Sequence, residues 1–157
     1  LARISSAALK RSRVNLSGLA AEIAIVLRAQ DARRPARITV HPHLVAEGDP
    51  ELLRIALEEL LANAWKFTAR SADAEIEFGK VPHTSPPEYF VRDNGVGFDA
   101  HAAHQLFEPF QRFHPATEFK GHGIGLAAVR RIVTKHGGRL WVESVPGRGA
   151  TFSFTLA

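Results

Sequence analysis

One stretch with a helical pattern places a carboxylate, an amide and an ammonium group on the same side. Glu59, Asn63 and Lys66 lie four and three residues apart within residues 50–68, so on a helix they fall within about 60° of arc. An asparagine carbonyl is a hard oxygen suited to Mg²⁺, a lysine pairs with phosphate, and a glutamate can orient a water or hydroxyl. A solvated helix face without a ligand is the alternative, and the spacing alone leaves both open.

A second candidate group, residues 93–97, directly follows the strand-like run 89–92. Asp93, at a buried strand end, can accept a hydrogen bond from the exocyclic amine of adenine and would repel the O6 acceptor of guanine. Gly97 leaves no Cβ in the path of a base that approaches the backbone. An ordinary Asp-Asn-Gly turn is the alternative explanation.

A third candidate group is the glycine-rich run 121–125, which opens a helix-forming segment over residues 125–136. Alternate glycines at a helix N-terminus expose consecutive N–H groups to an anion, aided by the helix dipole. The spacing matches neither of the two common nucleotide fingerprints. A flexible hinge is the alternative.

These groups must be positioned by the surrounding elements, about five strands and three main helices. This pattern predicts one domain of the α+β or mixed α/β class. We expect helices over residues 50–68 and 125–136, and another that begins at Asn15 or Ser17 and has Leu19, Ile23, Val26 and Leu27 on its core face. Residues 1–13 are expected to end a further helix, and a short one is expected near residues 102–107. The expected strands are residues 37–41, 74–81, 88–92, 139–144 and 151–156.

Composition narrows the function classes. The 157 residues are 45% hydrophobic and 23% charged with a net charge of +4, which fits one folded domain. The absence of cysteine excludes disulfides, thiolate metal sites and cysteine nucleophiles. Basic and acidic residues are interleaved, so nucleic-acid binding is not expected. The histidine pairs at 41/43 and 101/104 lack a third ligand nearby, so no dedicated zinc site is expected. Because methionine is absent even at position 1, we expect a piece of a longer chain.

In order and spacing, four runs resemble the N, G1, F and G2 boxes of the catalytic ATP-binding domain of sensor histidine kinases. These runs are residues 59–68, 93–98, 106–113 and 121–127, and residues 147–154 are similar to the family's closing hairpin. The resemblance covers nearly all of residues 15–157. The Phe-Gln-Arg-Phe-His sequence at 110–114 and residues 118–120 are most similar to kinases attached to PAS or phytochrome-type sensors.

The resemblance implies the Bergerat ATP-binding fold. This fold is an α/β two-layer sandwich in which a mixed, mostly antiparallel sheet of about five strands carries three main helices on one face. Residues 15–157 would form the catalytic domain, and residues 1–14 the end of a dimerisation helix and its linker. The nucleotide would lie between a helix and a lid.

The resemblance also assigns roles around the phosphates. Asn63 would hold Mg²⁺ and the phosphates, Lys66 would contact phosphate, and Arg112 would reach the phosphates from the lid. Glu59 stands where these kinases often have asparagine, and where the related gyrase, mismatch-repair and chaperone ATPases have a glutamate general base. The other implied nucleotide contacts of the lid and glycine run are Phe110, Gly121, His122, Gly123, Ile124, Gly125 and Leu126. His122 replaces the threonine or serine of many relatives.

Around the base, the resemblance implies that Asp93 reads the adenine amine. Gly97 and Thr151 would complete this edge through water, Gly95 would belong to the same loop, and Phe67 would lie near the base or ribose. The implied reaction is transfer of the ATP γ-phosphoryl group, with Mg²⁺, to a histidine on dimerisation helices absent from this chain.

The implied partners are those phosphoacceptor helices, a response regulator receiver domain and a second copy in a homodimer, with the domain in the cytoplasm. Two alternatives remain. One is a mechanical ATPase of the same superfamily, which would turn over ATP without a histidine acceptor. The other is a nucleotide-sensing module without catalysis.

Overall fold

The computed structural model describes residues 8–99 and 125–157 of the chain. The described helices are α2 (Leu16–Gln30), α3 (Pro50–Phe67) and α4 (Gly125–Lys135). The described strands are β1 (Ser12–Asn15), β2 (Ala36–Val40), β3 (Val45–Gly48), β4 (Ala74–Lys80), β5 (Tyr89–Asp93), β6 (Leu140–Val145) and β7 (Gly149–Phe154). The short helix expected near residues 102–107 lies outside these residues.

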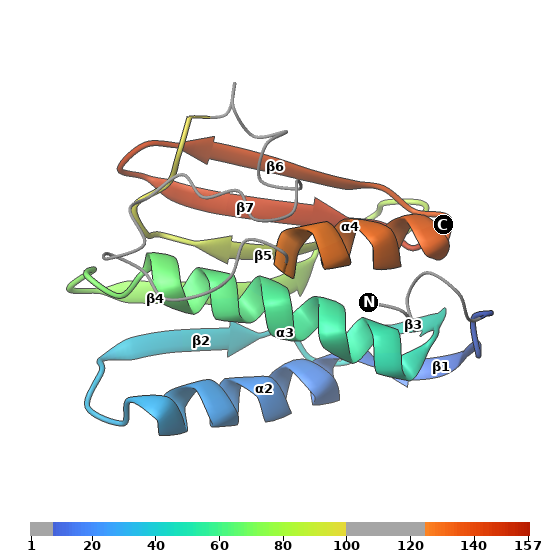
Figure 1. Cartoon of the computed structure of the whole chain (residues 1–157), viewed down its shortest axis with the longest axis horizontal. Helices are drawn as coiled ribbons and strands as arrows, with labels where there is room; N and C mark the ends of the chain where they lie inside the picture. Colours follow the sequence, from blue (N-terminus) through green and yellow to red (C-terminus); the bar gives the residue numbers. More distant parts are fainter. Residues whose placement is uncertain (1–7, 100–124) are drawn as a thin grey trace.

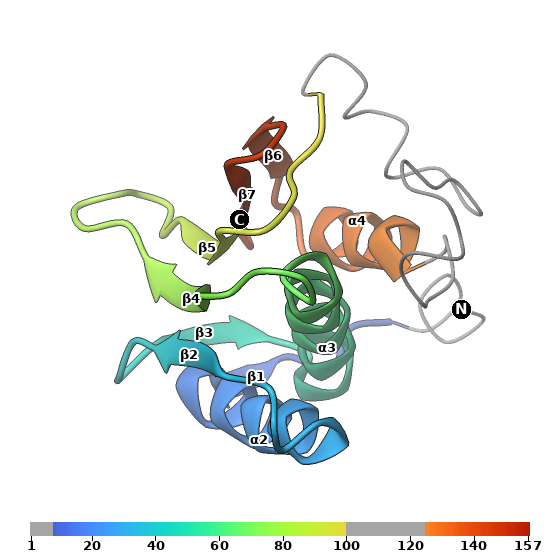
Figure 2. The ribbon, with the colours of Figure 1, turned by 90° about the vertical axis from the view of Figure 1, so that its left-hand side faces the viewer.

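The expected two-layer architecture is confirmed. Five strands form a sheet in the order β2-β4-β5-β7-β6, in which β2 and β4 are parallel and the other neighbours are antiparallel. The helices α2, α3 and α4 lie in a layer on one face of this sheet (Figures 1 and 2). The sheet is therefore mixed and mostly antiparallel, and its other face carries no described helix.

The sequence explains where two of the helices begin. The Asp49 side chain accepts hydrogen bonds from the N–H groups of Glu51 and Leu52, and Pro50 occupies the first turn of α3, where its missing N–H costs nothing. Of the two candidates for the start of α2, Asn15 is the cap, because its side chain accepts from the Gly18 N–H at 3.0 Å. Ser17 instead donates to the His41 carbonyl.

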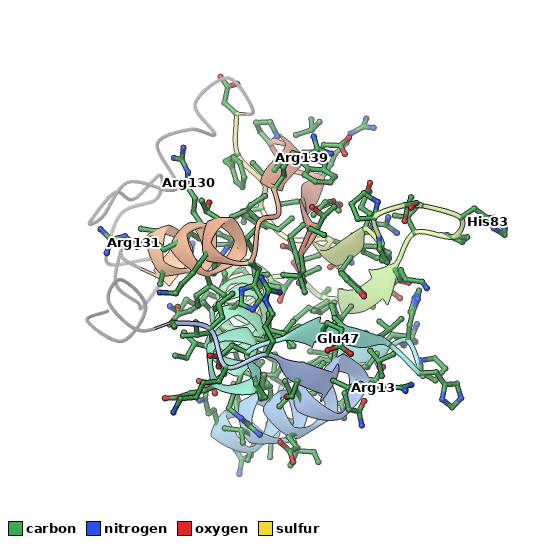
Figure 3. The ribbon with its side chains drawn as sticks, turned by 90° about the vertical axis from the view of Figure 1, so that its right-hand side faces the viewer. Arg13, Glu47, His83, Arg130, Arg131 and Arg139 are labelled. Carbon is green, nitrogen blue, oxygen red and sulfur yellow. The ribbon has the colours of Figure 1, made fainter. Side chains whose placement is uncertain are left out.

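The start of the chain differs from expectation. Residues 8–13 are not helical, and β1 pairs antiparallel with β3, a strand that the sequence did not predict. Arg13 and Glu47 stand opposite each other in this pair (Figure 3). Opposite charges at facing positions of neighbouring strands stabilise the pairing. Val26 was also expected in the core but is 60% exposed, since α2 turns Ala20, Ile23, Ala24 and Leu27 inward.

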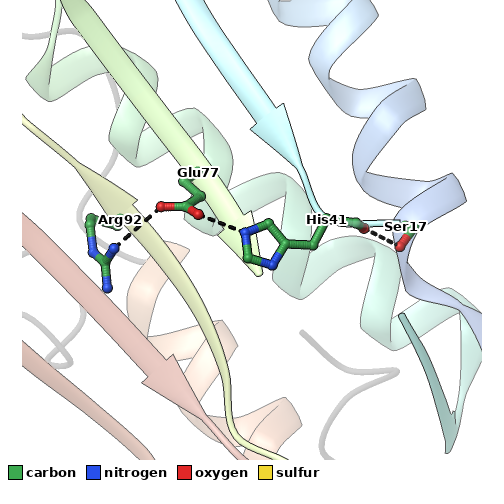
Figure 4. A network of polar contacts seen from close by, with 4 residues as sticks. All are labelled: Ser17, His41, Glu77 and Arg92. Atoms are coloured by element: carbon green, nitrogen blue, oxygen red, sulfur yellow. Dashed lines mark hydrogen bonds and ion pairs between the residues drawn. The ribbon is translucent and has the colours of Figure 1, made fainter. Parts of the chain in front are cut away.

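The two faces of the sheet differ in character. The face toward the helices buries Ile76, Phe78, Val91, Phe152 and Phe154 against α3 and α4. The opposite face is polar, and on it Glu77 contacts the imidazole of His41 at 2.6 Å and Arg92 at 3.3 Å (Figure 4). No helix of the described part of the chain is long and apolar enough to cross a membrane.

Candidate functional site

Asp93 is a buried carboxylate at the end of a central strand, on the helix-covered face. It is the last residue of β5 and is only 5% exposed. Its Oδ1 accepts the Gly95 N–H at 2.8 Å, and its side chain also accepts the Ala150 N–H. Burial raises the pKa of this carboxyl from 3.8 to about 6, and the two backbone N–H groups oppose that rise. The group is therefore mostly ionised at pH 7, with acceptor capacity left for a ligand.

The loop after Asp93 is tied to the C-terminus of α3 and to the β6–β7 turn. The Val96 N–H donates to the Phe67 carbonyl at 3.1 Å, and the Gly147 N–H donates to the Val96 carbonyl at 2.6 Å. Gly97 has φ +65°, and a Cβ there would overlap the Val145 carbonyl oxygen. A Cβ at Gly95 would likewise overlap the Phe67 carbonyl. Both glycines are thus required by close backbone contacts that fix the loop.

Asn94 has a structural role within this loop. Its side-chain amide donates to the Asp73 carbonyl at 2.7 Å, and its oxygen accepts the Glu75 N–H at 2.8 Å. These bonds close the start of β4 onto the end of β5. Asn94 therefore holds Asp93 in place and is not free to contact a ligand.

The polar stripe of α3, formed by Glu59, Asn63 and Lys66, runs from the middle of the helix to its C-terminus. Glu59, Asn63, Lys66 and Phe67 are all partly buried. Glu59 lies against the start of α4, since a Cβ at Gly125 would overlap its Oε2. The amide nitrogen of Asn63 is buried and has no hydrogen-bond acceptor among the described residues. An unpartnered, buried amide donor fits an anion such as phosphate.

The C-terminus of α3 is held by a residue that the sequence did not single out. The Arg34 guanidinium stacks over the Trp65 ring at 4.0 Å, donates to the Trp65 carbonyl at 2.6 Å and contacts the Thr68 hydroxyl. Partial burial lowers the pKa of Arg34, although nearby Asp31 opposes this. A basic group that bonds the last carbonyls of a helix stabilises its end. Arg34 thereby fixes the turn that carries Lys66 and Phe67.

The strand register separates Thr151 from Asp93. Asp93 stands opposite Ala150 on β7, whereas Thr151 stands opposite Arg92 and Glu143. Successive side chains of a strand point to opposite faces, so Thr151 lies on the polar face, away from the Asp93 carboxylate. The expectation that Thr151 completes the adenine edge is therefore not supported. Ala150 occupies that place and contributes its N–H.

The remaining expected residues divide into two sets. Gly125 and Leu126 begin α4, and the Leu126 side chain is buried in the core. Six others lie outside the described residues, namely Phe110, Arg112, Gly121, His122, Gly123 and Ile124.

The described residues therefore combine the Asp93 carboxylate, which can accept the amine of adenine, with the Asn63 amide, which can donate to a phosphate oxygen. Asp93 and the stripe of α3 are linked through Phe67, whose carbonyl binds the loop and which is one turn from Asn63. Together with the two-layer fold, this arrangement is chemically suited to an adenine nucleotide.

The family of histidine kinase-, DNA gyrase B- and HSP90-like ATPases matches residues 48–157. Cyanobacterial phytochrome A of Nostoc sp. is 40% identical over 131 residues, which are 83% of this chain and 17% of that protein. The methanogenesis regulatory histidine kinase FilI of Methanothrix harundinacea is 43% identical over 118 residues, 71% of this chain and 13% of that protein. The structure of full-length ShkA in complex with AMPPNP has a TM-score of 0.77 at 27% identity, covering 98% of this chain and 32% of that chain.

The chain belongs to this ATPase family, and within it the chain is the ATP-binding catalytic domain of a sensor histidine kinase. The expected likeness to phytochrome-type kinases is confirmed. The chain spans less than a fifth of the length of the two curated relatives it matches here.

Proposed function

We propose that the chain binds ATP with Mg²⁺ between α3, the loop 94–97 and the start of α4, and that it transfers the γ-phosphoryl group to a histidine on separate helices. The observation that carries this proposal is the buried Asp93, 5% exposed, whose loop is bonded to the same helix that presents Asn63. ShkA, whose fold this chain shares, was solved with AMPPNP, an ATP analogue.

Asp93 selects adenine in this proposal. Its carboxylate accepts the exocyclic amine of adenine, while guanine would present its O6 acceptor to the same group. Gly95 and Ala150 hold the carboxylate in position through their N–H groups. Gly97 allows the edge of the base to lie against the loop.

Asn63 and Lys66 bind the phosphate end. The Asn63 amide nitrogen donates to a phosphate oxygen, which supplies the acceptor it lacks among the described residues. The Asn63 carbonyl and the Glu59 carboxylate are oxygen ligands of the type that Mg²⁺ prefers, so the donor set fits that ion. When bound, Mg²⁺ neutralises phosphate charge during transfer. Glu59 could also act as the base for the attacking histidine.

The acceptor is expected outside this chain. The acceptor of such kinases is a histidine followed by an acidic residue on a long helix, and none of the eight histidines here is followed by Asp or Glu. In-line transfer needs the nucleophile at roughly 3–3.5 Å from phosphorus, opposite the leaving oxygen. We therefore propose that dimerisation helices of the same protein, in a cytoplasmic homodimer, present the histidine. A response regulator receiver domain would then accept the phosphoryl group.

Labelling with γ-labelled ATP tests this function. We expect the 157-residue chain to remain unlabelled alone, and to label an added dimerisation domain that carries the acceptor histidine. The label should be stable in base and labile in acid. Asn63→Ala should abolish labelling, whereas the exposed Asp73→Asn should not. Label that accumulates on this chain alone would contradict the proposal, and steady ATP hydrolysis without transfer would favour a mechanical ATPase.

A further inference from the structure

Glu59 places a negative charge at the start of α4, beside the proposed phosphate site. Its Oε2 lies so close to Gly125 that any Cβ there would overlap it. Glu59 is partly buried, and among the described residues it has no ion pair. Part of the negative charge is balanced by the N-terminal end of the α4 dipole.

Groups on α3 and α4 act on an incoming phosphate chain in opposite directions. The unpartnered Asn63 amide and the N-terminus of α4 attract phosphate oxygens. The Glu59 carboxylate, one turn before Asn63 on the same helix, repels them. Like charges interact strongly at short range in a partly buried site, where water screens them poorly. A nucleotide without a bound cation would thus meet both effects at once.

We infer that Glu59 makes this site selective for the metal-complexed form of its nucleotide. A divalent cation between the carboxylate and the phosphates converts the repulsion into two attractions. An uncharged amide at position 59 would not repel the phosphates of a metal-free nucleotide in this way. This inference rests on the proposed function and adds a specificity determinant to it.

Nucleotide affinity with and without metal provides the test. ATP is titrated calorimetrically into the 157-residue chain in excess Mg²⁺ and again in excess EDTA. The measured quantity is the ratio of the Kd in EDTA to the Kd in Mg²⁺. We expect Glu59→Gln to lower this ratio at least about tenfold, or about 1.4 kcal/mol, mainly by tightening metal-free binding. The neighbouring Glu58→Gln is the matched control: it removes the same charge from an exposed position of α3 and should leave the ratio unchanged.

Two further measurements separate a charge effect from structural damage. Adenosine carries the base without phosphates, so its affinity should be the same in the wild type and in Glu59→Gln. Glu59→Asp keeps the charge, so its metal dependence should stay close to that of the wild type, and it replaces Glu59→Gln as the test if the amide variant does not fold. A ratio in Glu59→Asp as low as that expected for the amide would then overturn the inference.

The outcomes distinguish this inference from the function on which it rests. If the wild type binds ATP with Mg²⁺ and Glu59→Gln has the same ratio as the wild type, the inference is wrong while the proposed function stands. If the wild type does not bind ATP with Mg²⁺, the proposed function itself fails. An equal loss of ATP and adenosine affinity in Glu59→Gln would show a structural role and would also overturn the inference.

Discussion

Replacing Asp93 with asparagine keeps the size of the side chain but removes its charge and one of its acceptor oxygens. In the wild type the carboxylate accepts N–H groups from Gly95 and Ala150 and remains 5% exposed. In Asp93→Asn, the single amide oxygen cannot serve both backbone donors and the adenine amine. The amide nitrogen adds a donor where only donors converge.

The expected loss follows from one unsatisfied buried donor. Such a group costs about 1–3 kcal/mol, which corresponds to roughly a tenfold to hundredfold weaker ATP affinity. The preference for ATP over GTP should shrink as well, because the amide can donate to the guanine O6. A general loosening of the site would weaken both nucleotides and leave their ratio unchanged.

Titration calorimetry of ATP and GTP with Mg²⁺ measures both quantities. Asp73→Asn is the control, since its side chain is exposed and only its backbone carbonyl contacts Asn94. An ATP affinity for Asp93→Asn within about twofold of the wild type would refute the adenine-reading role of Asp93.

Three other predictions follow from the packing around the site. Burial raises the pKa of Asp93 above its unfolded value of 3.8 to about 6. The protonated carboxyl therefore contributes about 3 kcal/mol to the stability of the folded state. This contribution is complete below pH 3.8 and is lost as the pH rises through 6. The free energy of unfolding of the wild type relative to Asp93→Asn should therefore fall over that range in urea titrations. Arg34→Ala should lower the free energy of unfolding by about 1–3 kcal/mol, while Arg33→Ala, at an exposed position, should change it little. Gly97→Ala should weaken ATP binding at least about tenfold. Gly147 also has a positive φ, +81°, but a Cβ added there would meet open space, so Gly147→Ala should lower stability only by the backbone strain of about 1–2 kcal/mol.

Local signals in the sequence were sufficient for the long elements. The cap at Asp49 and the leucines of residues 50–68 predicted α3 almost to its ends, and Gly137 marks the stop just after α4. The alternation in residues 74–81 likewise predicted β4. These elements carry their own capping and periodicity, so no distant contact was needed to recognise them.

The short edge strands could not be predicted in this way. β1 and β3 have four residues each and little alternation, and they exist because they pair with each other across a whole helix. Val26 shows a related limit. Val26 fits the apolar pattern of a helix. Which apolar positions become buried, however, depends on the angle at which α2 meets the sheet.

Within the candidate site, the sequence predicted which residues could bind a ligand but not the contacts between them. The stripe of α3 and Asp93 were proposed from residue types and spacing. The contacts of Glu59 with Gly125 and of Gly97 with Val145 join residues far apart in the sequence, and only the fold shows them. Ala150 was missed although its alternation with Phe152 and Phe154 would have placed it, and not Thr151, beside Asp93.

Amide chemical shifts during an ATP titration test most directly where the nucleotide binds. We predict that Mg²⁺-ATP shifts the amide signals of Gly95, Ala150 and Gly125 most strongly. Signals from the polar face of the sheet, such as those of Thr39 and Glu143, should move little. That face also has a groove, of about 550 Å³, lined by both residues. Large shifts along that groove, with none at Gly95 and Gly125, would contradict a nucleotide site on the helix-covered face.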